Sequence, residues 1–242
     1  MRNRSERFGD SDSDDFPRRW WNARPTRTAE GRPWKFAWRN DGDPAAQRNI
    51  ARAVITDDGE VERIVGHAEG GLRRVSDLQS FADATTRATP ESLTSIVEAL
   101  YFHLKNDLHF TYSAELGYDE GKKVRWVRLP GATVYSQRRT CIDLVVLFMS
   151  CLANAKLSPI YIHLLGDPNH SLAGVWIGKP DPDFERTDLR TLNRLISDGR
   201  ILTVECCGFC SAVLEQDEVG ARRRRVLTRS RSRKLASKRR NR

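Results

Sequence analysis

A cysteine, a histidine and a glutamate are spaced along this chain in a way that suits nucleophilic catalysis. Cys141 opens the apolar segment CIDLVVLFMSCLANAK, and Thr140 precedes it as a helix-capping residue. A thiol in the first helical turn lies at the positive end of the helix dipole, which favours the reactive thiolate. His170 follows one expected strand and Glu205 ends another, so they are the candidate base and orienting acid. The pattern predicts a Cys-His-acid triad that transfers acyl groups through a thioester.

Other residues compete for these roles. His163 lies inside the strand-like segment YIHLL, where a buried structural histidine is the favoured interpretation. Asp181 and Asp183 rival the glutamate, but they belong to a proline-rich loop, whereas an orienting acid needs a rigid position. Cys151 is ten residues further along the same apolar helix and is expected to be structural.

An acyl-transfer site also needs donors for the oxyanion. The backbone N–H of Cys141 is one candidate, and the Gln137 side chain is the other. Tyr112, Val124 and Trp126 are expected to form walls near the cysteine. Near the end of the domain, CCGFC carries a metal-ligand spacing, but a lone CxxC is a weak signal. We therefore expect no metal and no cofactor.

Four segments between Tyr101 and Cys207 carry a family resemblance. They are GKKVRWVRLP, TCIDLVVLFMSCLANAKLSPIYI, NHSLAGVWIG and ILTVECC. Together they resemble the transglutaminase-like domain family, in a bacterial branch sometimes found beside helicase-like modules, which has a papain-like cysteine fold. The resemblance implies that the four segments supply the approach to the site, the nucleophile helix with its first core strand, the histidine strand and the acid strand.

The resemblance also implies roles for single residues. Cys141 would be the nucleophile, His170 the base and Glu205 the orienting acid, with Asp143 as a structural residue of the family. The chain differs from the usual family pattern directly after the histidine, where it has SL, and at the end of the acid strand, where it has CC.

Apolar spacing predicts an α+β fold. A capped helix is expected over residues 91 to 105, and a helix from 141 to about 155 that is apolar almost all round and therefore buried. SPIYIHLL, LAGVWIG and RILTVEC are expected to be core strands, with a helix between the last two at about 188 to 196. The expected architecture is a papain-like or transglutaminase-like core in which the nucleophile helix packs on an antiparallel sheet.

Composition divides the chain into three parts. Residues 1–48 have little periodic apolar signal, although they include four tryptophans, and are expected to be mostly disordered. Residues 49–220 form the expected transglutaminase-like domain, whose first part, from Ile50 to Val75, alternates around turn residues and predicts an accessory hairpin. Residues 221–242 form the expected basic disordered tail.

The distribution of charge along the chain indicates which partners it could bind. The tail has twelve Arg or Lys and no acid, whereas residues 49–220 have six more acids than bases, so the pI of about 9.6 reflects the ends of the chain. The tail could bind nucleic acid or an acidic partner through counterion release, or remain solvated. With no apolar run long enough for a membrane span and no signal-like N-terminus, the expectation is a cytoplasmic protein that does not enter the membrane.

Two functions follow from these features. The first is a cysteine-dependent enzyme, by default a peptidase or amidase and otherwise a transglutaminase-like acyltransferase, acting on a protein or peptide. The alternative is a non-catalytic binding module of the same fold whose tail holds nucleic acid or an acidic partner.

Overall fold

The computed structural model describes residues 35–39, 49–73, 76–113, 118–119, 124–136, 139–164, 170–181, 184 and 189–214. Gln137, Asp183 and the basic tail lie outside these ranges, as do residues 1–34.

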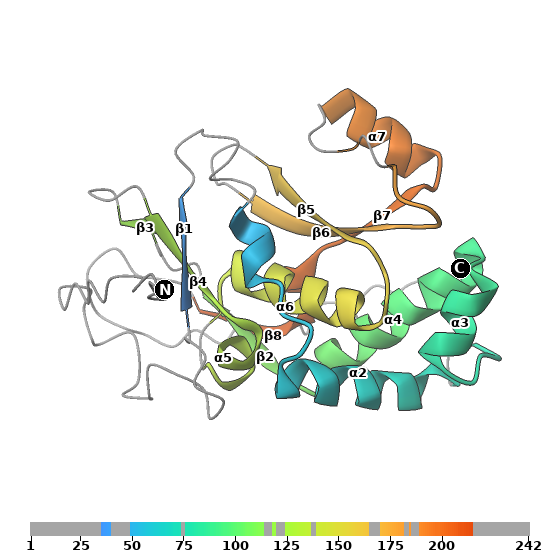
Figure 1. The fold of residues 1–242 in the computed structure, drawn as a ribbon. Coiled ribbons are helices and arrows are strands. Elements are labelled where there is room, and N and C mark those ends of the chain that lie inside the picture. The colour runs from blue at the N-terminus through green and yellow to red at the C-terminus, as the bar shows by residue number, and fades with distance from the viewer. Residues whose placement is uncertain are drawn as a thin grey trace, which may run out of the picture.

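The described residues form an α+β fold around one buried helix (Figure 1). Helix α6 (Cys141–Asn154) packs on a three-stranded antiparallel sheet of order β5-β6-β7. The strands are β5 (Pro159–Leu164), β6 (His170–Trp176) and β7 (Ile201–Val204). Helix α7 (Leu189–Ser197) lies across the sheet from α6 (Figure 1), and its Leu195 packs with the sheet residues Trp176 and Ile201.

Three helices form the layer on the other side of α6, which are α2 (Gly59–Leu72), α3 (Phe81–Arg87) and α4 (Pro90–Asn106). The 3-10 helix η2 (Asn49–Ala53) lies apart from them and packs in a second cluster with β4 and α6. The apolar faces of α2 and α4 pack on each other and on α6, which forms one continuous core.

Two smaller sheets flank this core. β4 (Val124–Arg128) pairs antiparallel with both β1 (Lys35–Arg39) and β3 (Tyr118–Asp119). β2 (Phe110–Ser113) pairs in parallel with β8 (Cys210–Leu214). The short helix α5 (Pro130–Tyr135) and the 3-10 helix η3 (Cys206–Phe209) connect these sheets to the core.

Helix α6 is the centre of the fold because nearly every side chain on it is apolar. Twelve of its fourteen residues are buried, from Cys141 to Leu152. One side packs on Ala173 and Val175 of β6, and another packs on Val127 of β4. A helix held on all sides is a rigid support for whatever its first turn carries. The expected buried helix is confirmed.

The capped helix α4 is also confirmed. The Thr89 hydroxyl accepts from the amide of Ser92, the Ser92 hydroxyl accepts from the amide of Thr89, and Pro90 stands in the first turn. The three core strands and the helix before the last of them lie where the apolar spacing predicted them, within two residues at their ends.

One expectation was wrong. The segment expected to form an accessory hairpin is helical, because Asp58 caps α2 by accepting from the amide of Glu60, at 2.9 Å. Its apolar residues Val61, Ile64, Val65, Ala68 and Leu72 follow helical spacing and are buried. Within residues 1–48, the structure describes residues 35–39, which form the edge strand β1 paired with β4. The expectation for the rest of this segment lies outside the described residues.

No helix among the described residues has both the length and the apolar character needed to cross a bilayer.

Candidate functional site

Cys141 is the first residue of α6 and is only 4% exposed. A capping box fixes this helix start. The amide of Thr140 donates to Oδ2 of Asp143 at 2.9 Å, and the amide of Asp143 donates to the Thr140 hydroxyl at 3.4 Å. The predicted position of the thiol in the first turn is therefore confirmed.

Asp143 does more than cap the helix. Its carboxylate also accepts from the backbone amide of Arg128 at 2.8 Å and from Nη1 of the Arg128 guanidinium at 2.6 Å. Both side chains of this ion pair are almost fully buried. One buried carboxylate thus ties the start of α6 to the end of β4, in keeping with the structural role expected for Asp143.

The chain that enters α6 is held by Arg139. Its guanidinium donates to the carbonyl oxygens of Thr133 and Val134, both at 2.7 Å, and lies 4.3 Å from the centre of the Phe110 ring. Its own carbonyl accepts from the amide of Ser113 at 2.9 Å. These contacts hold α5, β2 and the start of α6 in one arrangement, which keeps the position of the thiol fixed.

His170 and Glu205 form a hydrogen-bonded pair between Nε2 and Oε2. The second carboxylate oxygen of Glu205 accepts from the amide of Cys207 at 2.8 Å, because Glu205 caps η3. The histidine is one-third exposed and the glutamate about half exposed. Because Glu205 engages Nε2, only Nδ1 of His170 is left to serve a thiol.

Cys141 meets β6 at Ser171, the residue that follows His170. The backbone and hydroxyl of Ser171 lie near enough to the thiol to lower its pKa in part. Side chains alternate along a strand, so Ser171 faces α6 with Ala173 and Val175, whereas His170 shares the other face with Trp176. Within the described residues, no hydrogen bond joins the thiol to the His170 ring.

Electrostatic effects link the two parts of the site. The pKa of Tyr112 rises to about 12 because of burial, and both Cys141 and Glu205 contribute to the rise. Burial also raises the pKa of Cys207, again with contributions from Cys141 and Glu205. Tyr112 and Cys207 are therefore within electrostatic range of both the thiol and Glu205. The structure brings the pair together as predicted, and a direct contact of Cys141 with His170 stays a prediction.

A second histidine stands on the thiol side of β6. His163 of β5 is opposite Ser171, and its Nδ1 lies 3.2 Å from the Tyr161 hydroxyl and 3.4 Å from the Ser171 hydroxyl. The two hydroxyls are 2.8 Å apart. Burial lowers the pKa of His163, with a further contribution from Arg125. His163 is thus a hydrogen-bonded, half-buried imidazole, in keeping with the structural role favoured from the sequence.

Burial raises the pKa of the Cys141 thiol, which is the main influence on it. The positive charge of Arg125 and the neighbouring Ser171 lower it in part, whereas Asp143 raises it further. The net direction opposes the thiolate expected from the helix dipole, since desolvation of a buried anion is the larger effect. A base must therefore take the proton when this thiol reacts near neutral pH.

The other cysteines are buried or half-buried free thiols. Cys151 is fully buried, and burial raises its pKa strongly, in keeping with the structural role expected for it. Burial also raises the pKa of Cys206, and that of Cys210 to about 12. Among the described residues, no three His, Cys, Asp or Glu side chains are grouped so that they could hold a metal ion.

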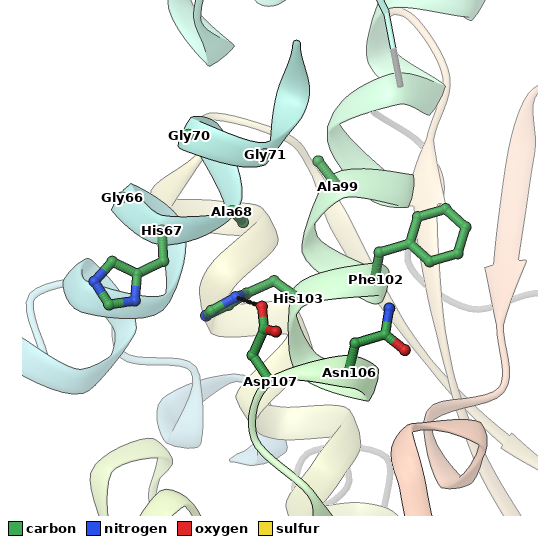
Figure 2. A pocket seen from close by; sticks show the side chains of 10 residues that line it. All are labelled: Gly66, His67, Ala68, Gly70, Gly71, Ala99, Phe102, His103, Asn106 and Asp107. Atoms are coloured by element: carbon green, nitrogen blue, oxygen red, sulfur yellow. Dashed lines mark hydrogen bonds and ion pairs between the residues drawn. The ribbon is translucent and has the colours of Figure 1, made fainter. Parts of the chain in front are cut away.

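A groove of about 760 Å³ lies between α2 and α4, and none of the proposed triad lines it. Figure 2 shows His103 and Asp107 pointing toward each other across one turn of α4, and Nδ1 of His103 lies 2.6 Å from Oδ2 of Asp107. His67 of α2 packs edge-on against the His103 ring, with centroids 5.5 Å apart. No cysteine is among the residues that line this groove, which is therefore separate from the Cys141 thiol at the start of α6.

Sequence reasoning missed three contributors to the site. Ser171, Tyr161 and Arg125 reach the thiol or its neighbours through strand pairing and packing, which no local spacing reveals. The alternative acid Asp181 lies in the loop after β6, and the carboxylate that engages His170 is Glu205. Gln137, the expected oxyanion donor, lies outside the described residues.

No protein-family model, curated protein or solved structure is significantly similar to this chain.

Proposed function

We propose that this protein is a cysteine-dependent acyl-transfer enzyme that acts on an amide of a protein or peptide. Cys141 is the nucleophile, His170 is the base and Glu205 orients the histidine. The observation that carries the proposal is that the Cys141 thiol, at a rigid helix start, lies beside Ser171, and that the residue before Ser171 is the His170 of the His170–Glu205 pair. Tyr112 and Cys207 are within electrostatic range of both the thiol and Glu205.

The first half of the reaction forms a thioester. Nδ1 of His170 takes the thiol proton as the sulfur attacks the carbonyl carbon, and Glu205 stabilises the resulting imidazolium through Nε2. The imidazolium then gives its proton to the departing amine. Proton removal by a base suits this site, because burial raises the pKa of Cys141 and keeps the thiol protonated before substrate arrives.

The second half resolves the thioester. Water attacks the acyl carbon with His170 as base, releasing the acid and returning the thiol. A second amine in place of water would give transamidation instead. The backbone N–H of Cys141, at the positive end of α6, is the proposed donor to the oxyanion in both halves.

A papain-like or transglutaminase-like core is the architecture that we propose for this fold. Support comes from the chain order of the site, which is a cysteine at the start of a buried helix, then a histidine at the start of a strand, then an acid at the end of the next strand of the same sheet. The antiparallel pairing of β6 with β7 brings the last two residues together.

Ester turnover tests the assignment without knowledge of the natural substrate. Hydrolysis of p-nitrophenyl acetate is expected in the wild type and lost in Cys141→Ala, while the variant stays folded because only one sulfur atom is removed. Cys151→Ala is the matched control, since it removes a fully buried thiol of the same helix and should lower stability without removing turnover. Turnover that survives in Cys141→Ala would refute the role of the thiol.

The second candidate is a non-catalytic binding module, which the near-complete burial of the Cys141 thiol favours. In that case the basic tail, residues 221–242, would hold nucleic acid or an acidic partner in the cytoplasm. Retention on immobilised nucleic acid with a steep salt dependence, lost when residues 221–242 are removed, together with no ester turnover, is the result that selects this candidate. Equal retention of both forms would place the binding surface on the folded part.

A further inference from the structure

Arg125 is a half-buried charged residue whose Nε atom is buried and lacks a hydrogen-bond partner among the described residues. No acidic side chain of the described residues forms an ion pair with it, in contrast to Arg128 three residues later, which is paired with Asp143. Nε of Arg128 is likewise buried and lacks an acceptor, but Nη1 of the same guanidinium is paired with Asp143, so Arg125 is the guanidinium near the thiol that a ligand acceptor would stabilise.

The side chain of Arg125 faces the catalytic thiol. Arg125 and Val127 are two residues apart on β4 and therefore point to the same side of the strand. Val127 packs on Ile142 and Val146, so this side of β4 covers α6. The second residue of α6 is Ile142, which directly follows Cys141, and the start of that helix is thus the surface that Arg125 approaches.

Electrostatics agree with this placement. The charge of Arg125 acts to lower the pKa of Cys141 and of three groups near it, which are Tyr112, Tyr161 and His163. The only carboxylate at the site with a role in the proposed reaction, Glu205, is already engaged by His170 and by a backbone amide. The positive charge beside the thiol is therefore available to an incoming anion.

We propose that Arg125 is a specificity-determining residue that binds a carboxylate of the substrate next to the carbonyl that Cys141 attacks. The substrate class is then a peptide whose acyl-donating residue carries an acidic group, such as a glutamate or aspartate side chain. A guanidinium suits this task because its planar donors match a carboxylate in two hydrogen bonds. The substrate half of this proposal rests on the proposed acyl-transfer function.

Alkylation of Cys141 measures the anion site directly. Iodoacetate and iodoacetamide react by the same step, in which the thiolate attacks the methylene carbon, the C–S bond forms and iodide leaves. They differ in carrying a carboxylate or a neutral amide. The ratio of the two rates cancels the thiolate fraction of Cys141, so it isolates recognition of the negative charge from any change in the thiol pKa.

The rates at Cys141 are measured by peptide mass spectrometry in the wild type, Arg125→Gln, Arg125→Lys and the control Arg194→Gln, an exposed arginine of α7. Glutathione gives the ratio for a thiol without a site. The expected iodoacetate to iodoacetamide ratio is about tenfold or more above that of glutathione in the wild type and the control, mostly kept in Arg125→Lys and lost in Arg125→Gln.

The outcomes separate this proposal from the function on which it rests. A wild-type ratio equal to that of glutathione, or a raised ratio that Arg125→Gln does not lower, overturns the anion site even if ester turnover is present. Resistance of Cys141 to both reagents overturns the proposed function and the anion site together. If the wild-type ratio is raised, two peptides that differ only by glutamate or glutamine at the acyl-donating residue should differ in kcat/KM, with the glutamate peptide higher. Equal values of kcat/KM would overturn the substrate class.

Discussion

Glu205 and His170 form a hydrogen-bonded pair that joins the end of β7 to the start of β6. The same carboxylate caps η3, so its orientation is set by the backbone as well as by the imidazole. A carboxylate fixed in this way holds one imidazole nitrogen and leaves the other for chemistry.

Replacing Glu205 by Gln should lower ester turnover by about tenfold to a thousandfold, because a neutral amide holds the ring but does not stabilise the imidazolium. The change should appear mainly in kcat, measured at saturating ester. Glu98→Gln, an exposed site on α4, is the matched control and should leave turnover unchanged. Full activity of the Glu205 variant would remove this residue from the reaction.

Asp143 should matter chiefly for stability. Asp143→Ala leaves the buried Arg128 guanidinium without its counter-charge and removes one of the two hydrogen bonds of the α6 capping box, so the free energy of unfolding should fall by about 3 to 5 kcal/mol. Urea denaturation measures this loss. Asp198→Asn changes an exposed acid and should have little effect. A loss below about 1 kcal/mol in Asp143→Ala would contradict the role of the ion pair in fixing the helix start.

Replacing either of two glycines by alanine should change the stability of the protein, in opposite directions. Gly66 is an exposed residue inside α2 and a Cβ added there meets nothing within 4 Å, so Gly66→Ala should stabilise the protein by about 0.5 to 1 kcal/mol. At Gly131 the added atom would lie 2.9 Å from Oδ2 of Asp58, the residue that caps α2. Gly131→Ala should therefore lower the melting temperature, and a rise in both variants would show that the contact yields without strain.

Stability should fall in alkaline solution. Burial raises the pKa of five cysteine thiols, that of Cys210 to about 12, so the folded chain keeps protons that the unfolded chain loses from about pH 8.5 upward. Because the folded state then binds more protons, the free energy of unfolding decreases as pH rises, by at most about 1.4 kcal/mol per pH unit for each group. Urea denaturation with a reductant at about pH 8, 9 and 10 measures the slope, and a flat profile would contradict thiol burial.

Local signals in the sequence were enough for some parts of this fold. Thr89 and Pro90 mark the start of α4, and the apolar run after Thr140 marks α6, because capping and burial act within a few neighbouring residues. Helix α2 was misread because its glycines resemble turn residues, whereas Asp58 and the buried stripe on α2 decide the outcome.

The parts of the fold and site that local sequence patterns did not predict depend on pairing and packing between residues far apart in the chain. Phe110 of β2 pairs in parallel with Cys210 of β8, a hundred residues away, and no local sequence pattern predicts such a pairing. In the candidate site, the Cys141 position and the His170–Glu205 pair followed from type and spacing. The roles of Ser171 and Arg125 depend on how β6 and β4 pack against α6, and only the folded chain brings them to the thiol.

If His170 takes the proton from Cys141, the rate at which p-nitrophenyl acetate acylates Cys141 should depend on the His170 imidazole. The acetyl adduct is located by peptide mass spectrometry in the wild type, His170→Gln and His163→Gln. We expect a single adduct, on Cys141, that forms about a hundredfold more slowly in His170→Gln than in the wild type. The rate in His163→Gln should be close to that of the wild type. An unchanged rate in His170→Gln, a loss confined to His163→Gln, or an adduct on Cys207 instead would contradict the proposed proton transfer from Cys141 to His170.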